Sequence, residues 1–352
     1  MRMQKMMRSF AVDAVGKLDF VEVPMPVVDD CTALVKIEAC GVCNGTDSKL
    51  AHGTFKNWHD YPTLLGHEAV GRVVEKGRLV TAFNVGDRVM LPFVDGPTGG
   101  YHSSWGGYSE YGTVGDWRAM QLAGRGPGTP GFSEGAYAQT KVPEGIDPVD
   151  ATMIVTFREV LSAMKRFGMK ENRSLVVFGA GPVGLCFTKF AKLIGMDPVI
   201  TLDITEQKMA DATAMGADHV FNSLSPDVTA SVRAILPDGA DFVVDAVGLN
   251  ALINKAMELV TYNGSICCYG ISPQLQMQLD WSRAPYNWTL QFVQFPLKIE
   301  EMEADSQILY WMQAGVLRAA DFISDVLPFD QMQEAFRMIE ERRTNKKTVI
   351  RF

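Results

Sequence analysis

Three side chains in the first part of the chain have the chemistry of metal ligands. Cys43 ends the run Cys-Gly-Val-Cys that begins at Cys40, and His67 and Glu68 stand together in Gly-His-Glu-Ala-Val-Gly. Thiolate, imidazole and carboxylate are the ligand types of zinc, and a catalytic zinc needs only three of them, which leaves a position for water or substrate. Taken singly, Cys43 is more typical of a small buried hydrophobe and His67 of a hydrogen-bonded histidine. Their combination with a nucleotide-binding motif in the middle of the chain favours the metal.

A glycine-rich turn in the middle of the chain predicts a dinucleotide site. The apolar run 175–178 leads into Gly-Ala-Gly-Pro-Val-Gly, and a helical pattern follows up to Gly195. In such a motif the first glycine allows the tight turn, the second lets the backbone approach a pyrophosphate, and the third packs the helix on the strand. The residues expected to line the cofactor here are Gly179, Gly181, Pro182, Val183 and Gly184. A glycine-rich turn in some other α/β unit is the alternative.

A carboxylate at the end of the next predicted strand strengthens this interpretation. The run 198–202 ends in Asp203, at the offset of roughly 20 residues where an acid binds the ribose hydroxyls. Ile204 and Thr205 follow it, so that no basic residue is in place for a 2′-phosphate, which favours NAD over NADP. Two later predicted strands close on Val247-Gly248 and on Gly270, at the edge where open α/β sheets bind ligands.

Length and composition restrict the class of protein. A chain of 352 residues predicts two domains, and 47% hydrophobic and 21% charged residues are typical of a globular protein. A net charge of −8 without any basic run disfavours nucleic-acid binding. Residues 1–12 lack an apolar core of signal-peptide length, and no run of about 18 apolar residues occurs, so we expect a cytoplasmic, unanchored protein. Six cysteines in a chain of this length do not indicate a disulfide framework.

The order of predicted elements indicates how the two domains are built. Short β-prone runs up to residue 90 predict a small β-barrel or sandwich, and the Gly-, Tyr- and Trp-rich stretch 92–135 predicts a long loop-rich insert. Between residues 155 and 288, strands and helices alternate, which predicts a parallel sheet covered by helices on both faces. Helices are expected at 157–167, 183–194, 206–215, 250–260, 306–315 and 330–343, and strands at 175–178, 199–202, 219–221, 241–246, 265–270 and 348–352.

Several motifs, in a fixed order, resemble the zinc-dependent medium-chain dehydrogenase family of alcohol, polyol and sugar dehydrogenases. They are C-G-V-C followed by T-D at 40–47, G-H-E-A-V-G at 66–71, V-G-D-R-V at 85–89, G-A-G-P-V-G at 179–184, D-A-V-G at 245–248 and L-P-F-D at 327–330. The resemblance implies an α/β protein with a β-rich, GroES-like catalytic domain at residues 1–155 and 293–352. A Rossmann domain with a doubly wound parallel sheet would occupy residues 156–292.

The resemblance also assigns roles to individual residues. It implies that Cys43 and His67 bind zinc, that Glu68 coordinates it directly or swings toward it, and that Thr46 relays the substrate proton. For the cofactor, it implies that Asp203 and Lys208 contact the ribose of NAD and that Lys347 lies near the pyrophosphate.

Three departures from the family pattern are visible. One residue too many separates Cys43 from Thr46. The third zinc-ligand position aligns with Val155, which cannot bind a metal, so that Glu68, or Glu159 one helical turn further on, would have to supply the carboxylate. Glu159 is equally explained by a salt bridge to Arg158. The stretch 92–137, where many relatives hold a four-cysteine structural zinc, contains no cysteine, so one zinc per chain is expected.

The expected reaction is hydride transfer between NAD and a secondary alcohol, giving the ketone. The polar groups Glu68, Arg158, Glu159, Tyr101 and His102, with Trp105, favour a polyol, cyclitol or sugar as substrate. The alternatives are a zinc-free quinone or enoyl reductase of the same superfamily and a catalytically silent nucleotide-binding protein. The resemblance further implies a homodimer or homotetramer formed through the edge strands near 266–271 and 286–293.

Overall fold

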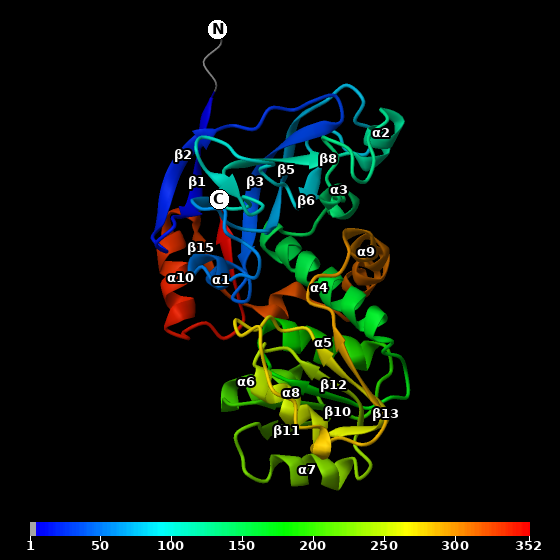
Figure 1. The fold of residues 1–352 in the computed structure, drawn as a ribbon. Coiled ribbons are helices and arrows are strands. Elements are labelled where there is room, and N and C mark those ends of the chain that lie inside the picture. The colour runs from blue at the N-terminus through cyan, green and yellow to red at the C-terminus, as the bar shows by residue number, and fades with distance from the viewer. Residues whose placement is uncertain (1–4) are drawn as a thin grey trace. The chain divides into compact units, whose positions relative to one another are not determined.

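The computed structural model describes residues 5–352, so the first four residues of the N-terminal segment 1–12 lie outside the described part. The chain forms two compact units (Figure 1), which we name after the roles that the resemblance implies: the catalytic unit, which runs to Arg158 and resumes over Leu297–Phe352, and the nucleotide unit, Glu159–Pro296. The predicted boundaries, after residues 155 and 292, lie three and four residues before these. Between residues 5 and 352, no helix has the length and hydrophobicity needed to cross a membrane.

The nucleotide unit contains a six-stranded sheet in which every pair of neighbouring strands is parallel. Its strands are β9 (Leu175–Phe178), β10 (Val199–Asp203), β11 (His219–Asn222), β12 (Ala240–Asp245), β13 (Val260–Cys268) and β14 (Trp288–Phe292). The spatial order is β11-β10-β9-β12-β13-β14. The strand order therefore reverses beside β9, as in the doubly wound dinucleotide-binding fold, and the predicted fold class is confirmed.

The central strand of this sheet is apolar along its whole length because both of its faces are covered. All four residues of β9 are buried, which is typical of a parallel strand between two helical layers. The helices of the unit are α5 (Pro182–Leu193), α6 (Glu206–Ala214), α7 (Val228–Ile235) and α8 (Asn250–Met257). The predicted helix 250–260 was too long, because Val260 already belongs to β13. Helix α7 was not predicted.

The catalytic unit is rich in β-strands and is built from both ends of the chain. One sheet has the order β2-β1-β4-β7, and another has β15-β16-β3-β5-β6 with β8 also paired to β3. The strands are β1 (Met6–Val12), β2 (Leu18–Pro24), β3 (Thr32–Val42), β4 (Thr63–Leu64), β5 (Glu68–Lys76), β6 (Arg88–Met90), β7 (His102–Ser103), β8 (Tyr111–Gly115), β15 (Ile323–Pro328) and β16 (Lys347–Arg351). The C-terminal strand β16 pairs antiparallel with β3, with Thr348 opposite Val42, so the end of the chain completes the sheet that carries the N-terminal motifs.

The stretch 92–135 is more ordered than the predicted loop-rich insert. Residues 111–115 form β8, which pairs with β3, and residues 117–122 form helix α2. Two glycines within these five strand residues weakened the β-signal, since glycine is depleted in strands. The prediction of a loop-rich insert was therefore wrong for residues 111–122, whereas residues 123–134 contain no helix or strand.

One helix of the catalytic unit, α4 (Pro148–Phe167), is much longer than the helix predicted for that segment. The helices of this unit are α1 (Asp47–Ala51), α2 (Trp117–Leu122), α3 (Gly135–Ala138), α4, α9 (Lys298–Gln313) and α10 (Met332–Glu340). Helix α4, which continues past the unit boundary, begins at Pro148 instead of near residue 157. The Asp147 side chain accepts from the Val149 N–H at 2.9 Å, and proline suits a first helical turn because its missing N–H has no partner there.

We expect one buried carboxylate to be important for the stability of the region around α2. Asp116 caps α2 by accepting from the N–H groups of Arg118 and Ala119, and its other oxygen accepts from the N–H groups of Thr81 and Ala82 at 2.8 and 2.9 Å. Replacing Asp116 by Ala leaves these donors unpaired and should lower the free energy of unfolding by about 2–3 kcal/mol, measured by urea denaturation.

The pH dependence of the same variant provides a check. Burial raises the pKa of Asp116, but the backbone donors outweigh burial, so its pKa lies below the usual value. A lowered native pKa stabilises the fold above the unfolded pKa of about 3.9 and loses that contribution as the pH falls through the native value. Asp116→Asn should lack this acid-dependent loss. Equal stability of the wild type and both variants at neutral pH would contradict the assigned role.

Candidate metal and cofactor site

The predicted glycine turn lies between β9 and α5, and its three glycines differ in what surrounds them. Gly179 has a φ of +95°, a conformation that favours glycine. A Cβ on Gly184 would lie 1.8 Å from the carbonyl oxygen of Gly179, so the helix can approach the strand only without a side chain. A Cβ on Gly181 would meet no protein atom within 4 Å. The turn is therefore tight at its two ends and open at Gly181, next to the N-terminus of α5.

Asp203 closes this turn from the end of β10. One carboxylate oxygen accepts from the N–H of Ala180 at 2.7 Å, and the other accepts from the N–H groups of Ile204 and Thr205. These bonds hold the acid beside the glycine turn. Lys208 lies half-buried in the first turns of α6, and its backbone N–H donates to the Thr205 hydroxyl.

The remaining predicted cofactor residues of the unit follow β12 and β13, which are parallel neighbours. One oxygen of Asp245 accepts from the N–H groups of Val247 and Gly248, both at 2.9 Å, and so shapes the turn after β12. A Cβ on Gly270 would lie 2.1 Å from the Gly248 nitrogen, which shows how closely the two turns approach. Val247 and Gly270 therefore lie at the strand edge that carries Gly179, because β12 also pairs in parallel with β9. Their contact with a cofactor stays a prediction.

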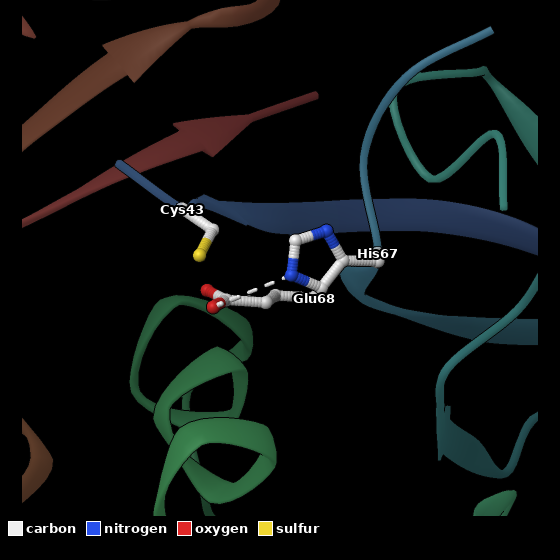
Figure 2. A group of neighbouring side chains, drawn as sticks. All are labelled: Cys43, His67 and Glu68. Carbon is white, nitrogen blue, oxygen red and sulfur yellow. Dashed lines mark ion pairs between the residues drawn. The ribbon is translucent and has the colours of Figure 1, made fainter. Parts of the chain in front are cut away.

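In the catalytic unit, three of the predicted metal ligands come together. A sulfur, nitrogen or oxygen atom from each of Cys43, His67 and Glu68 lies within 4.8 Å of the others, and no other such group occurs among residues 5–352. Figure 2 shows the thiol, one imidazole nitrogen and the carboxylate turned toward one another. His67 and Glu68 are buried, whereas Cys43 is only half-buried. The donor set, thiol with imidazole and carboxylate, fits a zinc ion.

Two paired strands bring these side chains together. Cys43 directly follows β3, and Glu68 is the first residue of β5, the strand that pairs antiparallel with β3. Glu68 stands opposite Gly41, and a Cβ on Gly41 would lie 2.2 Å from the Glu68 carboxylate. The glycine in Cys-Gly-Val-Cys thus leaves the space into which the carboxylate reaches.

Glu68 is also the centre of a buried ion pair. The Lys347 ammonium, at the start of β16, lies 2.7 Å from both carboxylate oxygens, and the Thr156 hydroxyl donates to one of them at 3.4 Å. Lys347 is expected near the cofactor pyrophosphate, but the structure shows its ammonium on Glu68 within the catalytic unit. Its contact with a cofactor stays a prediction.

A second carboxylate faces the imidazole. Nδ1 of His67 lies 3.4 Å from Asp47 Oδ1, and its Nε2 lies 4.0 Å from Glu68. An acid on Nδ1 fixes the ring and leaves Nε2 for a metal, the arrangement seen around zinc-bound histidines. Burial lowers the pKa of His67, but the charge of Asp47 and the contact with Cys43 outweigh it, so the pKa lies well above its usual value.

This raised pKa predicts how zinc binding depends on pH. Below the pKa of His67 the ring holds both protons, so a metal must displace one of them. Acidification by one unit should therefore weaken zinc binding about tenfold through His67 alone. The measurement is competition with a chelator of known affinity between about pH 6 and 8. Asp47→Asn removes the charge that raises the pKa and should flatten the dependence, whereas a pH-independent affinity of the wild type would contradict the prediction.

Two parts of the chain match known protein families. Residues 29–141 match the alcohol dehydrogenase GroES-like domain, and residues 182–292 match the zinc-binding dehydrogenase family. It is 27% identical over 348 residues to an alcohol dehydrogenase of Geobacillus stearothermophilus, covering 95% of both chains. It is 25% identical over 338 residues to a sorbitol dehydrogenase of Bombyx mori, covering 89% of this chain and 90% of the relative. The chain belongs to the zinc-dependent medium-chain dehydrogenase family.

The fold comparison agrees with this membership. A crystal structure described as a short chain alcohol dehydrogenase from Escherichia coli CFT073, in complex with NADH, superimposes with a TM-score of 0.79 at 21% identity and covers 99% of both chains. At this identity the likeness concerns the fold, which is the two-domain architecture predicted from the sequence.

Two predicted site residues of this dehydrogenase are placed less clearly than the three ligands. Thr46 is buried and directly precedes α1, where its side chain does not cap the helix. Glu159 is not a member of the group of mutually close ligand atoms. Val155, at the expected position of a third ligand, is fully buried and has only a hydrocarbon side chain, but its neighbour Thr156 reaches Glu68. The roles of Thr46 and Glu159 stay predictions.

Arg158 does not have the exposure expected of a substrate contact. It is fully buried, and its guanidinium donates to the Ala138 carbonyl, to the Thr140 hydroxyl and to Asp305. These bonds join α4 to α9 and to the segment after α3, which is a structural role. The suggestion that Arg158 recognises a hydroxyl-rich substrate was therefore wrong.

Several residues of the site were missed from the sequence. Asp47 was noted only as part of the Thr-Asp motif, and Tyr108 was not singled out. The only local signal for Asp47 was its spacing, because its carboxylate accepts from the backbone N–H of Cys43, four residues earlier. Trp105 lies with its ring centre 5.2 Å from that of His67, and its φ of +74° is rare for a residue with a side chain. It gives the metal group an aromatic neighbour.

Proposed function

We propose that this dehydrogenase oxidises a secondary alcohol of polyol, cyclitol or sugar type to the ketone, with zinc bound by Cys43, His67 and Glu68 and with NAD as hydride acceptor. The observation that supports it most is the mutual approach of these three ligand types within one group, in which His67 and Glu68 are buried. When bound, zinc polarises the substrate oxygen and lowers the pKa of the alcohol. A small-molecule alcohol is the substrate class of the family.

The chain's own residues would divide the remaining work. Asp47 fixes the ring of His67 through Nδ1, and Lys347 balances the charge of Glu68 while holding its carboxylate close to the other ligands. Thr46, at the start of α1, is the hydroxyl we propose to carry the substrate proton away. The ring of Trp105 lies next to His67, where it would pack against the carbon skeleton of the substrate and exclude water.

The preference for NAD rests on Asp203 and on the two residues after it. The carboxylate lies at the end of β10 beside the glycine turn, and a 2′-phosphate there would meet its negative charge without a basic residue at positions 204 and 205. The structural neighbours do not decide the choice, because one was solved with NADH and another with NADP. We also propose one zinc per chain, because residues 92–137 supply no cysteine for a second, structural ion.

A homo-oligomer formed through the edge of the nucleotide-unit sheet completes the proposal. Of the two segments predicted to form edge strands, 266–271 does not lie at an edge, because β13 has a strand on either side. Strand β14 stands last in the sheet order, and the side chains of Tyr286 and Phe292 are 100% and 58% exposed. Unpaired strand edges with apolar neighbours favour association with another copy. Light scattering at increasing salt concentration would give the mass, and a monomer at micromolar concentration would argue against this interface.

The deciding experiment is a substrate and cofactor panel on zinc-loaded protein. We expect NADH formation with polyols, cyclitols or sugars, weaker formation with simple aliphatic alcohols, and little turnover when NADP replaces NAD. Turnover of simple alcohols alone would overturn the substrate class, and equal use of both cofactors would overturn the role of Asp203. Full activity with well under one zinc per chain would favour a zinc-free reductase, and cofactor binding without any turnover would favour a catalytically silent protein.

A further inference from the structure

A buried tyrosine that was not predicted to belong to the site lies close to the group formed by Cys43, His67 and Glu68. Tyr108 is fully buried, and its hydroxyl lies 2.5 Å from Asp47 Oδ2 and 3.1 Å from the Gly41 carbonyl. A phenol has one proton to donate. The shorter contact, to a charged acceptor, is the one that receives it, because charge-assisted hydrogen bonds are short and strong.

The Asp47 carboxylate, which accepts the hydrogen bond from Tyr108, contacts two of the three proposed metal ligands. Asp47 Oδ2 also accepts from the backbone N–H of Cys43 at 2.9 Å, and Oδ1 faces Nδ1 of His67 at 3.4 Å. Neither Oδ1 nor Nδ1 has a hydrogen-bond partner among the described residues, so each is free to bond to the other across this short distance. The rotation of the Asp47 carboxylate therefore decides how the imidazole is held.

The backbone around Tyr108 is joined to the segment that leads into His67. The Tyr108 N–H donates to the Leu65 carbonyl at 2.9 Å, and the Gly107 N–H donates to the Gly66 carbonyl at 2.7 Å. Gly66 has a φ of +94°, and a Cβ there would lie 2.7 Å from Tyr108. Tyr108 thus contacts the chain next to His67 through its backbone, and it contacts Asp47, the acid that faces His67, through its side chain.

We propose that Tyr108 is a positioning residue for the metal: its hydroxyl fixes the Asp47 carboxylate, which in turn orients His67 and the turn that presents Cys43. This inference rests on the proposed zinc site. Burial, together with the charge of Asp47, raises the pKa of Tyr108 well above its usual value, so the phenol remains a proton donor at every working pH. Groups that orient a zinc-bound histidine from the second layer typically change metal affinity by 10- to 100-fold.

The test is the removal of this hydroxyl alone. Tyr108→Phe keeps the ring, which packs edge-on against Phe336, and deletes only the donor. We expect the zinc dissociation constant, measured by chelator competition, to rise about tenfold. The visible absorption bands of the Co²⁺-substituted protein should also shift, because the imidazole is held differently. A matched control is Tyr61→Phe, which removes a phenol bonded to the Leu50 carbonyl at 2.8 Å. It should leave both readouts unchanged.

A double-mutant cycle separates positioning from general stability. Asp47→Asn should itself weaken zinc binding, and adding Tyr108→Phe to it should cost much less than Tyr108→Phe costs in the wild type. Zinc affinity and Co²⁺ spectra of Tyr108→Phe that equal those of the wild type would overturn the inference, as would full additivity with Asp47→Asn. A wild-type chain that binds no zinc would instead overturn the proposed function, so the two failures are distinguishable.

Discussion

Replacing Glu68 by Ala should both unload the metal and destabilise the protein. The substitution removes the only carboxylate in the group of close metal-ligand atoms and leaves the buried ammonium of Lys347 without its counter-charge. Zinc binding should weaken by more than the roughly 10- to 100-fold that loss of a second-layer group costs. Because breaking a buried ion pair from one side strands a charge, the free energy of unfolding of the metal-free protein should fall by about 3–5 kcal/mol.

The double variant Glu68→Ala/Lys347→Met separates the two effects. Removing the stranded charge should recover most of the lost stability, since a buried pair is often replaceable by apolar residues at little cost. Zinc affinity should stay low, because no carboxylate has been returned. Recovery of zinc binding in the double variant would show that Glu68 acts through the ion pair and is not a ligand. Zinc content and urea unfolding, measured on the same samples, provide both readouts.

Two substitutions in the glycine turn should differ in their effect on stability. In Gly184→Ala the new methyl group would overlap the Gly179 carbonyl, so the nucleotide unit should lose about 3 kcal/mol or more, and NAD binding should fail with it. In Gly181→Ala the methyl group meets no protein atom, and the backbone φ of −72° is ordinary for alanine. The thermal midpoint should therefore stay within a degree or two of the wild type.

Gly181→Ala should nevertheless weaken NAD binding about tenfold or more, because its methyl group occupies the open side of the turn where we propose the pyrophosphate to lie. Calorimetric titration with NAD, beside thermal unfolding, measures both properties. Unchanged NAD affinity would contradict the placement of the pyrophosphate. Unchanged stability of Gly184→Ala would contradict the close approach of α5 to the turn.

The parts of the fold with strong local signals were predictable. Strand β9 was predicted with its observed limits, because a short apolar run that ends in a glycine turn has few alternatives. Helix α7 and strand β15 were not predicted: α7 has only two buried residues, and along β15 half-buried and exposed residues alternate without a buried one. Strand β8 depends on its pairing with β3, a contact distant in sequence that no local pattern encodes.

The residues of the site also fall into those that the sequence predicted and those that it did not. Cys43, His67 and Glu68 could be proposed because each lies in a compact motif of ligand types. The partners of these residues could not, because they come from distant parts of the chain: Tyr108 is 61 residues from Asp47, and Lys347 is 279 residues from Glu68. Lys347 stands in no motif of its own. Its predicted place near the cofactor came only from the resemblance to the family. Only the pairing of β16 with β3 shows what its ammonium neutralises.

The position of β16 late in the chain affects the order in which the two units can fold. The nucleotide unit is one continuous segment, Glu159–Pro296, and can fold as soon as it leaves the ribosome. The three proposed metal ligands are synthesised long before Lys347, which follows Glu68 by 279 residues. Until β16 has been synthesised, Glu68 has no lysine to balance it and β3 lacks one of its neighbours. We therefore expect the catalytic unit, and with it the proposed metal site, to be completed after the nucleotide unit has folded.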